Sequence, residues 1–140
     1  MDLQVVLTHL MQISTAYALA LPLAWNRERE TRTAGLRTFP LVAVAACGYM
    51  LVGLQVLSST DAEARVMYGV IVGMGFIGGG AILKAEGKVT GTATAASLWN
   101  TGAIGVAVAF HRYEVALILA AINFFTLYIG GRIKEMESVS

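Results

Sequence analysis

The sequence predicts an all-α, polytopic membrane protein in which residues 1–140 form one domain, a bundle of five transmembrane helices. Of the 140 residues, 56% are hydrophobic and only 14% are charged, and the mean hydropathy is +0.67. A water-soluble domain of this size could not hide so much apolar surface. The apolar residues also gather in five stretches, each near the roughly 20 residues that a helix needs to cross a bilayer.

Short polar connections separate the five predicted spans, which are residues 5–25, 39–57, 66–83, 92–110 and 113–131. Pro40 favours the start of the second span, because a proline in the first turn of a helix loses no hydrogen bond. Pro22 lies in the last turn of the first span and frees a backbone carbonyl, which a neighbouring group must satisfy in lipid. Polar side chains in the middle of that span, among them Gln12, indicate that it faces other helices.

The basic residues predict the orientation of the bundle. With five spans, the two chain ends fall on opposite sides of the membrane. Placing residues 26–38 in the cytoplasm puts eight of the ten Lys and Arg residues inside and leaves Arg65 and Arg112 outside, in keeping with the basic character of cytoplasmic loops. We therefore predict an outer N-terminus and a cytoplasmic C-terminus. The start of the chain is acidic where a cleavable signal would be basic, so we expect the first span to remain in the mature protein.

Glycine is concentrated in the third span, where two pairs recur at a spacing of four residues, Gly69 with Gly73 and Gly75 with Gly79. Small residues at this spacing let helix backbones approach closely in lipid, so we predict that these four glycines pack helices. The alternative is that the triplet at residues 78–80 breaks the helix beside an ion or a gate. Residues 73–78 also match the pattern GxGxxG, but no βαβ unit surrounds them, and we expect no dinucleotide cofactor.

Polar residues of the fourth span share one helix face, because Thr94, Ser97 and Thr101 recur at intervals of three and four. Asn100 lies to one side of this face. In membranes such side chains usually form hydrogen bonds to a neighbouring helix, and Asn123 and Thr126 of the fifth span are the expected partners. A polar pathway would need more than hydroxyl groups. We select Thr94, Ser97 and Asn100 as candidate functional residues.

The sequence carries no pattern of catalytic or metal-binding residues, so we predict neither an enzyme nor a bound cofactor. The single cysteine, Cys47, is interpreted as a small buried side chain, and His9 and His111 as polar anchors. The net charge of +1 gives no sign of a nucleic-acid partner. No predicted span carries a carboxylate near its centre, which argues against a proton-driven pump or a divalent-cation site within the membrane.

Three stretches resemble the signature blocks of the MgtC/SapB membrane family: AGLRTFPLVAVAACG (34–48), ARVMYGVIVGMGFIGGGAILK (64–84) and GTATAASLWNTGAIGVAVAF (91–110). The blocks keep the order and spacing of the family. The resemblance implies a bacterial inner-membrane protein linked to acclimation at low magnesium. For the namesake member it further implies survival of pathogens in macrophages and restraint of the F-type ATP synthase. That member has a soluble ACT-type domain after the fifth helix, which we expect this chain to lack.

The same resemblance selects further candidate functional residues. The Glu-Arg-Glu-Arg motif that opens the first cytoplasmic loop in the family falls on Asn26, Arg27, Glu28 and Arg29, so that Asn26 replaces a glutamate. The Ala-Gly-Leu-Arg-Thr motif supplies Arg37 and Thr38, and the arginine before the glycine-rich helix is Arg65. Gly91-Thr92-Ala93 departs from the usual Gly-Leu-Thr or Gly-Leu-Asn. The residues of the first loop could be simply solvated, or could dock on lipid headgroups or a partner.

Two functions remain open at this point. The first is a regulatory module, most simply a homodimer, that contacts itself and a membrane partner such as the F-type ATP synthase through its helices. The alternative is a transporter or channel for magnesium or another cation. It would use acidic residues at the two mouths, namely Asp61, Glu63 or Glu114 outside and Glu28 and Glu30 inside.

Overall fold

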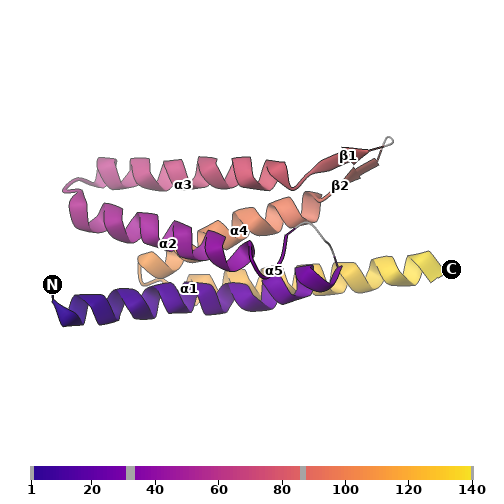
Figure 1. Ribbon diagram of the computed structural model, residues 1–140, viewed down its shortest axis with the longest axis horizontal. Helices are drawn as coiled ribbons and strands as arrows, with labels where there is room; N and C mark the ends of the chain where they lie inside the picture. The colour runs from indigo at the N-terminus through magenta and orange to yellow at the C-terminus, as the bar shows by residue number, and fades with distance from the viewer. Residues whose placement is uncertain (1, 31–33, 86–87, 140) are drawn as a thin grey trace.

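The computed structural model describes residues 2–30, 34–85 and 88–139 and contains five helices and one small hairpin within them. The elements are α1 (Leu3–Glu30), α2 (Phe39–Val56), α3 (Thr60–Gly80), β1 (Leu83–Ala85), β2 (Lys88–Thr90), α4 (Thr92–Ala109) and α5 (Tyr113–Val139). Successive helices run in opposite directions, and the two ends of the chain lie at opposite ends of the bundle (Figure 1). The predicted all-α fold is confirmed.

Three helices in the described part of the chain are long and apolar enough to cross a membrane: Leu3–Glu30, Phe39–Val56 and Tyr113–Ile133. α3 and α4 are not among them: α3 begins with a charged stretch that contains Asp61, Glu63 and Arg65, and α4 contains threonine, serine and asparagine among its apolar residues. Membrane-length helices are therefore present. The crossing of the bilayer by all five helices, and its direction, remain predictions.

Three of the predicted element bounds are wrong. α5 continues to Val139, beyond the predicted end at residue 131. α1 continues to Glu30, so that residues 26–30 are helical instead of forming the start of a loop. α3 begins at Thr60, well before the predicted span at 66, because Ser59 caps it by accepting a hydrogen bond from the backbone of Ala62 at 3.3 Å. Asp61 and Glu63 in its first turn also favour this start through the helix dipole.

The expected turn between the third and fourth spans contains the hairpin of β1 and β2, in which Leu83 pairs with Thr90. α3 ends at Gly80, so the glycine triplet terminates the helix and does not interrupt it. Gly91 follows the hairpin with a φ of +85°, a conformation that favours glycine. A Cβ atom at this position would also overlap the carbonyl oxygen of Ala81. Gly91 therefore lets the hairpin fold tightly against the end of α3.

α4 lies at the centre of the bundle and packs against all four other helices. Its buried residues are mostly small, and Gly105 sits directly on the backbone of α2: a Cβ at Gly105 would overlap the carbonyl oxygen of Ala43. Gln12 of α1, almost fully buried, donates hydrogen bonds to the carbonyls of Val108 and Ala109 at 3.2 and 3.1 Å. These carbonyls lie in the last turn of α4, and that of Val108 also accepts a hydrogen bond from the backbone N–H of His111 at 3.0 Å.

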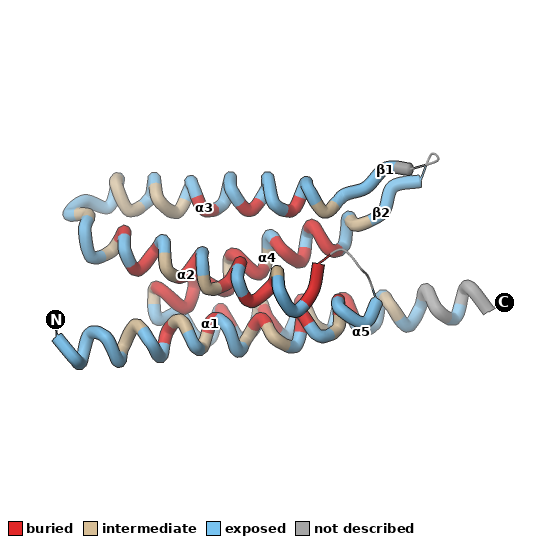
Figure 2. The backbone as a smooth tube through the Cα atoms, in the orientation of Figure 1, coloured by how far each residue is buried: buried red, intermediate tan, exposed pale blue. Residues whose placement is uncertain are grey.

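α3 is attached to the bundle along a single line of residues (Figure 2). Its buried residues are Val70, Met74 and Gly78, each one four positions after the last. At Gly78 the two backbones approach closely, since a Cβ there would lie 3.0 Å from the carbonyl oxygen of Ala95 in α4. The other residues of α3 are exposed or half-buried, so most of the surface of this helix faces outward.

Candidate functional site

The polar face of α4 is a helix interface. Ser97 Oγ donates a hydrogen bond to Asn123 Oδ1 at 2.7 Å, and Asn123 Nδ2 donates to the carbonyl of Ser97 at 3.2 Å. Both side chains are buried. The predicted partnership between this face and Asn123 of α5 is therefore confirmed. A reciprocal pair of this kind fixes how the two helices face each other.

Two further polar residues of α4, Thr101 and Asn100, have structural partners as well. Thr101 Oγ1 donates to the carbonyl of Ser97 at 2.8 Å within the same helix. Asn100, half-buried, donates from Nδ2 to the carbonyl of Leu119 on α5 at 3.2 Å. Ser97 and Asn100 thus form hydrogen bonds between α4 and α5. Neither side chain is left as an unpaired polar group in the apolar part of the bundle.

The last two turns of α1 hold the first group of candidates, Asn26, Arg27, Glu28 and Arg29. Arg27 is buried and forms an ion pair with Glu30, three residues along the helix. Glu28 accepts a hydrogen bond from the backbone N–H of Leu36 at 3.0 Å and so holds the following loop. Gly35 is required for this contact, because a Cβ at that position would overlap the Glu28 carboxylate.

The flanking candidates of this group are arranged differently. The guanidinium of Arg29 lies 4.8 Å from the ring centre of Trp25, which is a cation–π contact on the outer side of α1. Asn26 is half-buried, and its side-chain oxygen has no hydrogen-bond partner among the described residues. The carboxylates of the two glutamates in this group have partners within the protein: Glu28 accepts the bond from Leu36, and Glu30 pairs with Arg27.

A cavity of about 540 Å³ with a mixed polar and apolar lining lies between the end of α1, the hairpin, the start of α4 and α5. Its polar lining comes from Arg27, Glu30, Thr90, Thr92, Thr94 and Thr126. Two candidates from different parts of the sequence, Arg27 and Thr94, meet here. Sequence reasoning placed Thr126 near the α4 face but missed this cavity, because nothing in the sequence indicated that α1 extends far enough to reach it.

Arg37 and Thr38 line a second cavity of about 770 Å³ between α2 and α3, together with Gly69 and Gly73. Arg65, by contrast, lies exposed in the first part of α3, toward the opposite end of the bundle. The candidate arginines therefore do not form one site.

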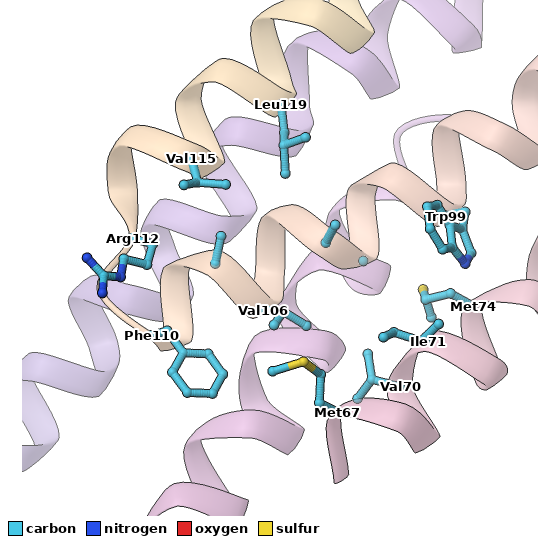
Figure 3. Close-up of a pocket in the computed structure, with 13 residues that line it drawn as sticks. Met67, Val70, Ile71, Met74, Trp99, Val106, Phe110, Arg112, Val115 and Leu119 are labelled. Atoms are coloured by element: carbon cyan, nitrogen blue, oxygen red, sulfur yellow. The ribbon is translucent and has the colours of Figure 1, made fainter. Parts of the chain in front are cut away.

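A third cavity, of about 430 Å³, lies between α3, α4 and α5 and is almost entirely apolar (Figure 3). Trp99 and Arg112 lie at its two ends, and the guanidinium of Arg112 points away from the other lining side chains. Met67, Ile71 and Met74 of α3 form one wall. The second and third cavities thus flank the line of residues by which α3 is attached.

The four glycines selected for helix packing do not pack against other helices of this chain. A Cβ added to Gly69, Gly73, Gly75 or Gly79 would meet no atom within 4 Å. Close helix contacts among the described residues are made at Gly78, Gly102 and Gly105 instead. The spacing of glycines indicates which faces can approach a helix, but it cannot tell whether that helix belongs to the same chain. A role of the four glycines in contacts between chains stays a prediction.

The described residues contain no group of three or more His, Cys, Asp or Glu side chains that could hold a metal ion. Asp61 and Glu63 belong to the first turn of α3, and Glu114 to the first turn of α5. At the other end of the bundle, Glu28 and Glu30 have the partners described above. The carboxylates proposed for the two mouths of a transporter are thus arranged as parts of helix ends.

Comparison with known proteins gives one family and several relatives. The profile of the MgtC family matches residues 13–136. SrpB of Synechococcus elongatus is 33% identical over 128 residues, which cover 82% of this chain and 69% of SrpB. MgtC of Salmonella typhimurium is 30% identical over 132 residues, 91% of this chain and 56% of that protein. MgtC of Brucella abortus is 36% identical over 94 residues, 67% of this chain and 39% of that protein.

No solved structure matches the chain. The chain spans little more than half the length of the Salmonella MgtC, so the relatives bear on the helical region that they share with it. That region includes the three sequence blocks, the buried Ser97 and Asn123 pair, and the ends of α1 and α2. Because the family profile covers nearly the whole sequence, the chain belongs to the MgtC family.

Proposed function

We propose that this protein is a multi-pass protein of the bacterial inner membrane that acts as a regulatory module, through helix contacts with a second copy of itself and with another membrane protein. The observation that carries the proposal is the outer face of α3, defined by Tyr68, Val72, Gly75, Phe76 and Gly79. The three large side chains are 70%, 53% and 86% exposed and recur every four residues.

Exposed apolar side chains are ordinary on a lipid-facing helix, so they do not by themselves indicate a protein contact. The argument for a contact with a second helix rests on the glycines. Gly75 and Gly79 belong to the same helix face as the large side chains, and a Cβ added at either position would meet no atom within 4 Å. A glycine inside a helix costs about 1 kcal/mol relative to alanine. Close packing of a second helix against Gly75 and Gly79 would offset this cost, because small residues let two backbones approach and gain contact along their length.

The partner beyond the second copy is proposed from the family resemblance. We propose a membrane protein such as the F-type ATP synthase, with low magnesium as the condition under which contact matters. A protein that restrains a partner by contact needs no catalytic group and no ion pathway, and the proposal assigns neither to this chain. Cation transport is the weaker candidate, because Glu28 and Glu30 are already engaged by Leu36 and Arg27.

Disulfide cross-linking in membranes tests the contact between copies. The only native cysteine, Cys47, is first replaced by serine, and Phe76→Cys is introduced on the outer face of α3. The matched control is Ile122→Cys, which is 59% exposed on α5. We expect a cross-linked dimer with Phe76→Cys and little with Ile122→Cys, and we expect Gly75→Leu to abolish the Phe76→Cys product.

Equal cross-linking at both positions would indicate random collision in the membrane and would sink the proposal. The same conclusion would follow if Gly75→Leu left the Phe76→Cys product unchanged. Binding of the proposed partner is measured by photo-cross-linking from position 76 in cells grown at low magnesium. Capture of subunits of the ATP synthase from position 76 and not from position 122 is the expected result.

A further inference from the structure

We propose that the groove between α2 and α3 binds one acyl chain of an anionic phospholipid, with the lipid phosphate at Arg37 and Thr38. The proposal rests on the membrane location given above but not on the contacts between helices. It concerns the cavity of about 770 Å³ described above, whose charged end is Arg37 with Thr38 and whose remaining lining is apolar apart from the hydroxyl group of Tyr49. A cavity with one charged end and an apolar body has the chemical pattern of a phospholipid.

The charged end of the groove is available for a ligand. Arg37 is exposed and forms no ion pair with the described residues. Thr38 is the N-cap residue of α2, yet its side chain makes no capping hydrogen bond, so its hydroxyl group can donate to a phosphate oxygen. The carboxylate of Glu28 also reaches this loop, but it accepts a hydrogen bond from the backbone of Leu36. The positive end of the α2 dipole adds to the attraction for an anion.

The apolar part of the groove owes its depth to two glycines. Gly69 and Gly73 line the α3 wall and leave open the space that side chains would fill. Along α2 the lining extends from Arg37 to Tyr49, which corresponds to roughly 18 Å of helix. One leaflet contributes about half of a hydrocarbon core that is about 30 Å thick. The groove therefore matches the depth of one leaflet, with its charged end at the level of the headgroups.

A transmembrane helix fits this groove less well than an acyl chain. A transmembrane helix presents side chains along its whole length and needs a contact surface of similar character throughout, whereas the only charged group among the described residues that line the groove, Arg37, lies at one end. An acyl chain is far thinner than a helix and carries its charge at one end only, as the groove does. The cavity between α3, α4 and α5 lacks this match, because the guanidinium of Arg112 points away from it (Figure 3).

Native mass spectrometry of the full chain in an uncharged detergent tests the site. Phosphatidylglycerol and phosphatidylcholine with identical acyl chains are titrated separately, and the affinity for the first bound lipid is measured. We expect phosphatidylglycerol to bind more tightly. Arg37→Gln should weaken it roughly fivefold, as expected for one arginine near an anionic surface, and should leave phosphatidylcholine unchanged. Arg37→Lys should retain most of the affinity, because it keeps the charge.

Two matched controls separate this site from general effects. Arg112→Gln removes the same charge at the other end of the bundle and should leave the affinity for phosphatidylglycerol unchanged. Gly73→Leu fills the groove and should weaken both lipids, whereas Gly75→Leu alters the other side of α3 and should weaken neither. Circular dichroism checks that each variant keeps its helices. If Arg112→Gln lowered the affinity as much as Arg37→Gln, the proposal would be overturned.

Two other occupants of the groove would give outcomes that contradict the proposal. Inorganic phosphate that competes with phosphatidylglycerol at equal concentration would indicate a site for the free anion. A Gly73→Leu variant that keeps its lipid affinity but loses the cross-linked dimer would indicate a helix of a second copy in the groove.

Loss of the dimer in Gly75→Leu with intact lipid binding would support both proposals. An intact dimer in Gly75→Leu, with lipid binding lost in Gly73→Leu, would remove the interaction module and leave the lipid site.

Discussion

Gly105 carries the closest approach between α2 and α4, because its missing side chain lets the carbonyl of Ala43 and the methyl group of Ala46 lie against the α4 backbone. We expect Gly105→Ala to destabilise the protein by about 1–3 kcal/mol, the usual cost of forcing an extra methyl group into a packed contact. Thermal unfolding in detergent measures the effect. Gly130→Ala on α5 is the control, since no atom lies within 4 Å of that position. An equal loss of stability at Gly130 would contradict this explanation.

The buried pair of Ser97 and Asn123 allows a second prediction for single residues. A double-mutant cycle with Ser97→Ala and Asn123→Ala should give a coupling free energy near 0.6 kcal/mol and below about 1.7 kcal/mol, the range for side-chain hydrogen bonds in membranes. Equilibrium unfolding in detergent micelles provides the four free energies. A coupling near zero would mean that the two side chains bond to other groups once the partner is removed.

The sequence predicted the role of single residues where polar side chains repeat at helical spacing and so mark one face of a helix. The interval of three and four residues from Thr94 to Thr101 predicted a buried polar face, and the bonds to Asn123 confirm it. The packing roles of Gly35 and Gly105 were missed, because each depends on a backbone distant in the sequence or across a turn. An isolated glycine gives no sign of what lies beside it.

At the scale of elements, the attachment of α3 along Val70, Met74 and Gly78 makes it the helix most easily separated from the bundle. We expect amide hydrogens of α3 to exchange faster than those of α4, which is enclosed by four helices. Met74→Ala should accelerate exchange in α3 further and leave α1 and α5 unchanged. Hydrogen–deuterium exchange with mass spectrometry measures each helix separately, and equal protection of α3 and α4 would contradict the prediction.

The bounds of the helices show where sequence patterns lose information. Apolar content predicted α2 and α4 closely, because their ends coincide with polar connections. Apolar content failed to predict the end of α1, where Asn26 and the four charged residues that follow it look like a loop but remain helical. Charged side chains can follow a helix out of the membrane, and the pair of Arg27 with Glu30 supports the last turn. The hairpin of β1 and β2 is too short to leave an alternating pattern.

At the scale of the whole molecule, the basic residues predict which end of the bundle is cytoplasmic. In a Cys47→Ser background, we expect Ser58→Cys in the α2–α3 connection to react with a membrane-impermeant maleimide added to intact spheroplasts. Lys88→Cys in the hairpin should react only after the membrane is permeabilised, since it lies at the opposite end of the bundle (Figure 1). The reverse pattern would invert the orientation, and reaction of both from outside would reduce the number of crossings.

A flux measurement on the whole protein distinguishes an interaction module from a transporter. We expect no saturable magnesium flux into proteoliposomes that contain the folded protein, because the described carboxylates form no cluster of three or more ligands. A variant with Glu28→Gln and Asp61→Asn serves as the comparison. Saturable flux that disappears in this variant would make the chain a transporter with carboxylates at its mouths and would replace the function proposed above.

The hydrogen bonds between α4 and α5 have a consequence for biosynthesis. Asn123 emerges from the ribosome after the whole of α4, so Ser97 and Asn100 have no partner on α5 while α4 is first presented to the membrane. An unpaired polar group is costly in lipid. We therefore expect α4 to stay at the translocon until α5 arrives, and the two helices to enter the bilayer as a pair. The polar face of α4, which joins α4 to α5 in the folded bundle, would then also determine the order in which the helices enter the membrane.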